Sequence, residues 1–161
     1  MTIQSFTSLK PQWLHLVWAT EDQRPWIPVG KERLLAQRVK QACRQQGIYL
    51  DVVNAHHDHL HLLARPHRPE GLEELRSLLT HACRRFIYHH LAQGSRENLR
   101  FQDWAQGIRG QDLGRVRRHL LRQEQVHQQF SLEKELRELG LIEANQGCVV
   151  LGDIEGRPLL R

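Results

Sequence analysis

Several features that usually reveal a protein's class are missing from this sequence or scarce in it. The 161 residues contain three cysteines, Cys43, Cys83 and Cys148, too widely spaced for the Cys-x-x-Cys pairs of a zinc site. No apolar run approaches the roughly 18 residues that a membrane-spanning helix needs. Residues 1–10 lack the basic-then-apolar order of a signal peptide. Glycine-rich phosphate loops and Ser-His-Asp arrangements are absent too. We therefore expect a cytoplasmic protein with reduced cysteines.

The composition that is present is typical of one soluble globular domain with a basic surface. Hydrophobic residues make up 40% and charged residues 25% of the chain, and the net charge is +5. Most of the positive charge is arginine, whose planar guanidinium suits phosphate better than the point charge of lysine does. Because an arginine-rich coding bias gives the same composition, charge alone leaves nucleic-acid binding open.

Hydrophobic periodicity predicts alternating strands and helices. We expect strands at 13–19, 48–54 and 59–65 and a short one within 99–108, and helices at 31–46, 69–91 and 111–128. Ser131 can cap a short last helix that ends at Gly140. The order predicts a split βαβ, ferredoxin-like α+β fold: a four-stranded antiparallel sheet with helices on one face, plus an additional C-terminal helix. We assign residues 1–140 to this domain and 141–161 to a tail with a hairpin in 147–161.

The run His59-Leu60-His61 lies in the third predicted strand. Side chains alternate along a strand, so both histidines should share the face opposite Leu60 and point together into the open. Two neutral imidazoles side by side make a two-ligand metal site with positions left for substrate oxygens. A surface pair without function has the same pattern. Asp58 could accept a ring N–H from the pair or simply close the hairpin loop.

A second polar line runs along the helix predicted at 111–128. His119, Gln123 and His127 are spaced i, i+4 and i+8 and should line one side of it, opposite Leu113, Val116 and Leu120. This line is either a solvated face or a face that covers the histidine pair.

Three segments together resemble single-tyrosine HUH transposases of the insertion-sequence 200/605 type. Residues 14–20 with Arg24-Pro25 look like the family's first strand, residues 58–63 like its metal-binding strand, and residues 116–127 like its nucleophile helix. The resemblance extends over residues 10–137 and implies a reaction on single-stranded or hairpin DNA. It also implies homodimers and a divalent ion, magnesium or manganese, held by His59, His61 and Gln123.

The sequence departs from the family at the nucleophile. The position of the family's tyrosine falls at His119, and the only tyrosines are Tyr49, in a strand, and Tyr88, in a helix. His119 could attack phosphate, act as a base for water, or join the metal; otherwise only DNA binding remains. We expect a DNA-binding protein of the HUH type without tyrosine-dependent strand transfer. The alternatives are a metal-dependent nuclease using water or His119, and a structural domain with vestigial histidines.

Arginines and tryptophans supply the remaining candidates. Trp26 and Trp104 could stack on unpaired bases or pack in the core. A two-fold homodimer should bury the polar line of the third helix and bring His119 and Gln123 within roughly 5 Å of the histidine pair. The arginines expected to contact phosphate, unless they form a solvated face, are Arg84, Arg85, Arg115, Arg117, Arg118 and Arg122.

Overall fold

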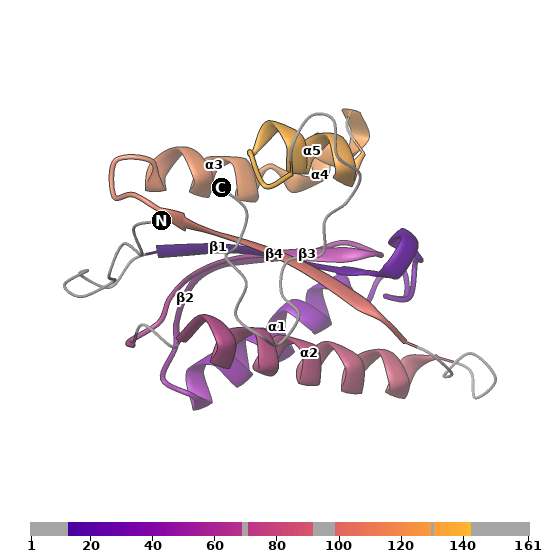
Figure 1. Cartoon of the computed structure of the whole chain (residues 1–161). Helices are drawn as coiled ribbons and strands as arrows, with labels where there is room; N and C mark the ends of the chain where they lie inside the picture. The colour runs from indigo at the N-terminus through magenta and orange to yellow at the C-terminus, as the bar shows by residue number, and fades with distance from the viewer. Residues whose placement is uncertain (1–12, 69–70, 92–98, 130, 143–161) are drawn as a thin grey trace, which may run out of the picture.

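Four antiparallel strands form the centre of the molecule. The computed structural model describes residues 13–68, 71–91, 99–129 and 131–142 (Figure 1). The sheet has the strand order β2-β3-β1-β4, which confirms the ferredoxin-like prediction. Its strands are β1 (Trp13–Thr20), β2 (Tyr49–Ala55), β3 (His59–Arg65) and β4 (Phe101–Ile108).

Two long helices, α1 (Glu32–Gln45) and α2 (Gly71–His90), cover one face of the sheet (Figure 1). They bury their apolar stripes against the strand residues that alternate inward. Gly47 has a φ of +70°, so it ends α1 in the left-handed conformation that glycine adopts without strain. The fully buried residues of this core include Leu16, Trp18, Leu35, Val39, Cys43, Leu60, Leu62, Leu75, Leu79 and Cys83.

The opposite face carries three shorter helices, α3 (Leu113–Leu121), α4 (Gln123–Gln129) and α5 (Leu132–Glu138). The prediction of a single helix at 111–128 is therefore wrong in one respect, because the helix breaks at Arg122 into α3 and α4. The side-chain amide of Asn54 on β2 donates to the Leu120 carbonyl at 3.1 Å. The Arg122 N–H turns back to the His119 carbonyl, also at 3.1 Å. Because the Asn54 contact is tertiary and no glycine or proline marks the break, the helical period gives no sign of it.

The start and end of α5 follow the prediction. The Ser131 hydroxyl accepts a hydrogen bond from the Lys134 N–H at 3.3 Å. Gly140 follows with a φ of +72°. Leu141 and Ile142 then fold back into the apolar layer beneath α5. The hairpin expected in 147–161 and Cys148 lie outside the described residues.

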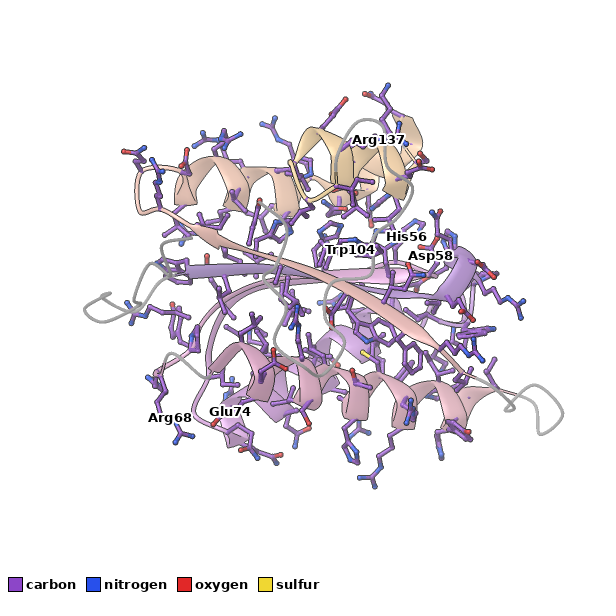
Figure 2. The ribbon with its side chains drawn as sticks, in the orientation of Figure 1. His56, Asp58, Arg68, Glu74, Trp104 and Arg137 are labelled. Carbon is purple, nitrogen blue, oxygen red and sulfur yellow. The ribbon has the colours of Figure 1, made fainter. Side chains whose placement is uncertain are left out.

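Two apolar clusters attach these short helices to the sheet, with polar side chains between them. One joins Val116 and Leu120 of α3 to Val52, Leu63 and Ile108. The other joins α5 to Val17, Ala19 and Trp104, so Trp104 is a core residue and does not face solvent. Figure 2 shows Trp104 beneath these helices and His56 with Asp58 at one end of the sheet. Among the described helices, none is long and apolar enough to cross a membrane.

Candidate metal centre

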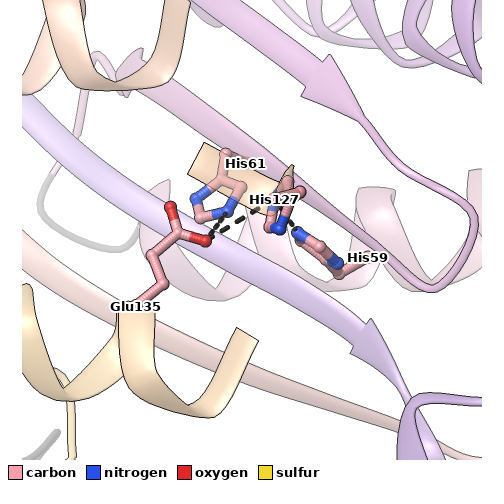
Figure 3. Close-up of side chains that lie close together, drawn as sticks. All are labelled: His59, His61, His127 and Glu135. Carbon is pink, nitrogen blue, oxygen red and sulfur yellow. Dashed lines mark hydrogen bonds and ion pairs between the residues drawn. The ribbon is translucent and has the colours of Figure 1, made fainter. Parts of the chain in front are cut away.

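The histidine pair of β3 is buried, and the prediction that it points into the open is wrong. His59 and His61 are each 1% exposed. They do lie on the face opposite Leu60, as the alternation predicts, but α4 and α5 cover that face (Figures 1 and 3). Register places His61 between Val17 of β1 and Asn54 of β2. The pair is therefore held rigidly in the middle of the sheet.

Asp58 positions His59 and also closes the β2–β3 hairpin. Its Oδ1 lies 2.5 Å from His59 Nδ1, and its carbonyl accepts the Thr20 N–H at 2.9 Å. Burial raises the pKa of the Asp58 carboxyl, but the hydrogen bond with His59 and the electrostatic influence of the neighbouring histidines outweigh it and hold that pKa below its usual value. His59 Nε2 is thereby turned toward His127 of α4, whose Nε2 is 2.8 Å away.

His61 is anchored in the same manner by His15, a buried residue of β1. His15 Nε2 lies 3.1 Å from His61 Nδ1, and burial lowers the pKa of both rings, so both are neutral at neutral pH. The other nitrogen, His61 Nε2, lies 3.4 Å from Glu135 Oε2. Neither atom of that pair has a hydrogen-bond partner among the described residues.

Glu135 is the functional candidate that the sequence analysis missed. It lies on α5, is 1% exposed, and accepts at Oε1 from His119 Nε2 and Gln123 Nε2, both at 2.7 Å. Burial would raise the pKa of its carboxyl, but the hydrogen bonds from His119 and Gln123 and the proximity of His61 hold it far below the usual range. One signal in the sequence could have identified Glu135: it is a carboxylate on the apolar stripe of the last helix, between Leu132 and Leu136.

His127, which the sequence placed on the polar line without a separate role, completes the cluster. Its Nε2 lies 3.6 Å from Glu135 Oε2, and burial, aided by the neighbouring His59, lowers the pKa of His127 to about 4. One ligand atom each from His59, His61, His127 and Glu135 lie within 4.8 Å of one another (Figure 3). Neutral imidazole nitrogens and a carboxylate oxygen suit a divalent transition metal.

The two further residues predicted for this site, His119 and Gln123, reach it through Glu135. Gln123 is 4% exposed, and its Oε1 is buried without a hydrogen-bond partner among the described residues. Gln123 also lines a cavity of about 570 Å³ together with His59, His61 and His127. The rest of the cavity wall comes from the residues before and within the start of α1, from the end of β2 with His56, and from Glu124 of α4.

The polar line of α3 and α4 is largely covered within one chain, although the His119 side chain is still 26% exposed. It was expected to need a partner subunit, but its side chains contact Glu135 of α5 and His59 of β3 instead. The burial argument for a dimer therefore does not hold.

The six predicted arginines do not form one surface. Arg84 and Arg85 lie on α2, across the sheet from the histidines. The other four lie on α3 or directly after it, and two of these have acidic partners. Arg117 pairs with Asp51 at 2.6 Å, and Arg115 lies 3.6 Å from Asp112.

Comparison with known proteins agrees with the fold. No curated protein matches the chain. A crystal structure of a candidate transposase from Deinococcus radiodurans R1 has a TM-score of 0.54 at 16% identity, covering 73% of this chain and 94% of that one. A REP-associated tyrosine transposase bound to a REP hairpin has a TM-score of 0.52 at 15% identity, covering 100% of each chain.

The family model described as transposase IS200 like matches residues 8–129, about three quarters of the sequence. The matched segment includes β1, the histidine strand and the α3–α4 polar line. The chain belongs to the IS200-like transposase family.

Proposed function

We propose that the chain binds single-stranded or hairpin DNA and that a divalent ion on His59 and His61 contacts the DNA phosphate. The observation that carries this proposal is that the buried histidine pair and Gln123 line the same cavity. The Oε1 of Gln123 is buried without a hydrogen-bond partner among the described residues. Magnesium or manganese bound there would polarise a phosphate oxygen. The REP hairpin bound by the structural neighbour supports DNA as the partner.

We also propose that tyrosine-dependent strand transfer is absent. His119 occupies the position four residues before Gln123 where the family resemblance expects the nucleophile. Tyr49 pairs with Arg65 at the far end of β3, which is roughly 20 Å from His59 at the usual rise of a strand. Tyr88 lies on α2, across the sheet. Neither tyrosine is placed to attack a phosphate at the histidine pair.

Arginines on α3 and just after it are the proposed phosphate contacts, because they lie on the same side of the sheet as the histidine pair. Arg118 and Arg122 are exposed, and Arg115 and Arg117 extend the same segment. Arg84 and Arg85 would have to contact a separate part of the DNA.

We propose the cytoplasm as the compartment because Cys43 and Cys83 are unpaired thiols. The homodimer remains a prediction from the family resemblance, to be tested by light scattering on the eluting protein.

The test is binding of a fluorescent DNA hairpin and of a scrambled single strand at several salt concentrations. Affinity should fall steeply with salt and should favour the hairpin. Replacing both Arg118 and Arg122 with glutamine should lower the log–log salt slope by about 0.9 for each phosphate that is no longer neutralised. Arg44→Gln, at an exposed position on α1, is the matched control and should leave the slope unchanged. Equal affinity for hairpin and scrambled strand would remove the hairpin from the proposal.

The alternative function is a metal-dependent nuclease that uses water, with His119 as the base. It is favoured by the 2.7 Å contact between His119 Nε2 and Glu135, which fixes the orientation of the ring. Labelled single-stranded DNA incubated with magnesium or manganese would be cleaved without a covalent protein adduct. An adduct mapped to His119 would instead identify that histidine as the nucleophile, and intact DNA would leave binding as the function.

A further inference from the structure

The four candidate ligand atoms of the metal centre, one from each side chain, lie within 4.8 Å of one another, close enough to surround one ion. With metal–ligand distances of about 2.0–2.2 Å for zinc, neighbouring ligand atoms lie roughly 3.3–3.5 Å apart. His59 Nε2 and His127 Nε2 are 2.8 Å apart. Glu135 Oε2 lies 3.4 Å from His61 Nε2 and 3.6 Å from His127 Nε2. The two separations that involve Glu135 are close to the tetrahedral value, and the separation between the two histidine nitrogens is shorter than it.

Each of three ligands is also held by a partner on its far side. Asp58 Oδ1 contacts His59 Nδ1, and His15 Nε2 contacts His61 Nδ1, which leaves the two Nε2 atoms directed at the centre. Such contacts fix the tautomer and orientation of a metal-binding imidazole. Glu135 Oε1 is occupied by His119 and Gln123, so that Oε2 remains.

Two of the four ligand atoms need a partner that the described side chains do not provide. His61 Nε2 and Glu135 Oε2 are buried without a hydrogen bond among the described residues, and each side chain is 1% exposed. Buried polar atoms are nearly always satisfied by protein, water or an ion. A cation between them satisfies both at once, since each atom presents a lone pair.

We propose that His59, His61, His127 and Glu135 form a four-coordinate site for a zinc-type ion, in which Glu135 takes the place that the family resemblance gives to Gln123. The inference rests on the proposed function only in placing an ion on the His59–His61 pair. Three nitrogens and one oxygen suit zinc, whereas magnesium prefers six oxygen ligands. Glu135 lies beyond residue 129, where the family match ends. The four ligands fasten α4 and α5 to β3, and a phosphate oxygen reaches the ion as a fifth ligand, an expansion that zinc accepts.

The experiment uses the full chain, stripped of metal with a chelator and titrated with Co²⁺ as a spectroscopic probe and Zn²⁺ as competitor. We expect one ion per chain and the intense visible absorption of four-coordinate Co²⁺. Glu135→Gln and His127→Gln should each lower Zn²⁺ affinity by more than about 100-fold. Gln123→Ala should cost only about 10–100-fold, the range for residues that position a ligand.

Matched controls are Glu133→Gln, on the exposed side of α5, and His81→Gln, on the exposed side of α2. Both should bind metal as the wild type does. The weak absorption of six-coordinate Co²⁺, or wild-type affinity in both Glu135→Gln and His127→Gln, would overturn the proposal. A larger loss of Zn²⁺ affinity in Gln123→Ala than in Glu135→Gln would also overturn it, because that result would make Gln123 the ligand.

A fold check and a DNA measurement keep the outcomes separate. Circular dichroism establishes whether each variant folds. If Glu135→Gln does not fold, the site is tested by the Zn²⁺ affinity of His127→Gln and by the rise in the wild-type Tm on adding zinc. An unchanged Tm with zinc would count against the site. Hairpin binding is measured on stripped and loaded wild type. Loss of hairpin binding with a four-coordinate Co²⁺ spectrum would refute the DNA function and leave the metal site standing.

Discussion

The metal-free protein should lose stability in mild acid because it buries a neutral histidine. His127 has its side chain 8% exposed, and burial together with His59 lowers its pKa from 6.5 to about 4. The unfolded chain takes up a proton on this ring near pH 6.5, whereas the folded chain does so only near pH 4. Between these values the unfolded state binds more protons, so the free energy of unfolding decreases as the pH falls.

The size of the effect follows from the two pKa values. A shift of one pKa unit corresponds to about 1.4 kcal/mol, so the full contribution of His127 is roughly 3 kcal/mol, and about 2 kcal/mol of it is lost between pH 7 and pH 5. Urea unfolding in the presence of a chelator, followed by fluorescence of the buried Trp18 and Trp104, measures this loss. His127→Gln removes the titrating ring and should flatten the profile by that amount.

A matched variant separates this effect from general acid sensitivity. His81→Gln removes an exposed histidine of α2 and should leave the pH profile parallel to that of the wild type. The groups that face His127, namely His56, His59, His61 and Glu135, are present in both proteins. If wild type and His127→Gln lose the same free energy between pH 7 and pH 5, the ring is not buried as described and the reasoning is refuted.

Three further outcomes test the packing and the outer contacts of the site. Leu136→Ala, in the cluster beneath α5, should cost about 2–5 kcal/mol in urea unfolding, whereas Leu121→Ala at an exposed position should change stability by less than about 0.5 kcal/mol; equal losses would contradict the packing. Asp58→Asn should weaken metal binding about 10–100-fold in a Zn²⁺ competition titration, since it removes the carboxylate that orients His59; unchanged affinity would separate Asp58 from the site. Burial raises the pKa of Cys43 to about 11, so a thiol reagent mapped by mass spectrometry should modify it only after unfolding, and rapid labelling of the native protein would be inconsistent with this burial.

Local pattern was enough to predict most of the fold. The alternation around His59 and Leu60 placed the histidines on one face of β3, and the period of Val116 and Leu120 placed the apolar side of α3 on the sheet. These features depend on residues close together in the chain, whose periods of two and 3.6 can be read directly. The break at Arg122 depends on Asn54, far away in sequence, and could not be read that way.

The sequence by itself determined the order of strands and helices, the histidine pair, the polar line His119–Gln123–His127 and the family to which the chain belongs. Only the tertiary structure decided what surrounds the pair. It buried both rings, linked His119 and Gln123 to Glu135, and brought His127 against His59. The physical reason is that no local period encodes where α5 packs against the sheet. A carboxylate more than seventy residues from the histidines is therefore joined to them by packing alone.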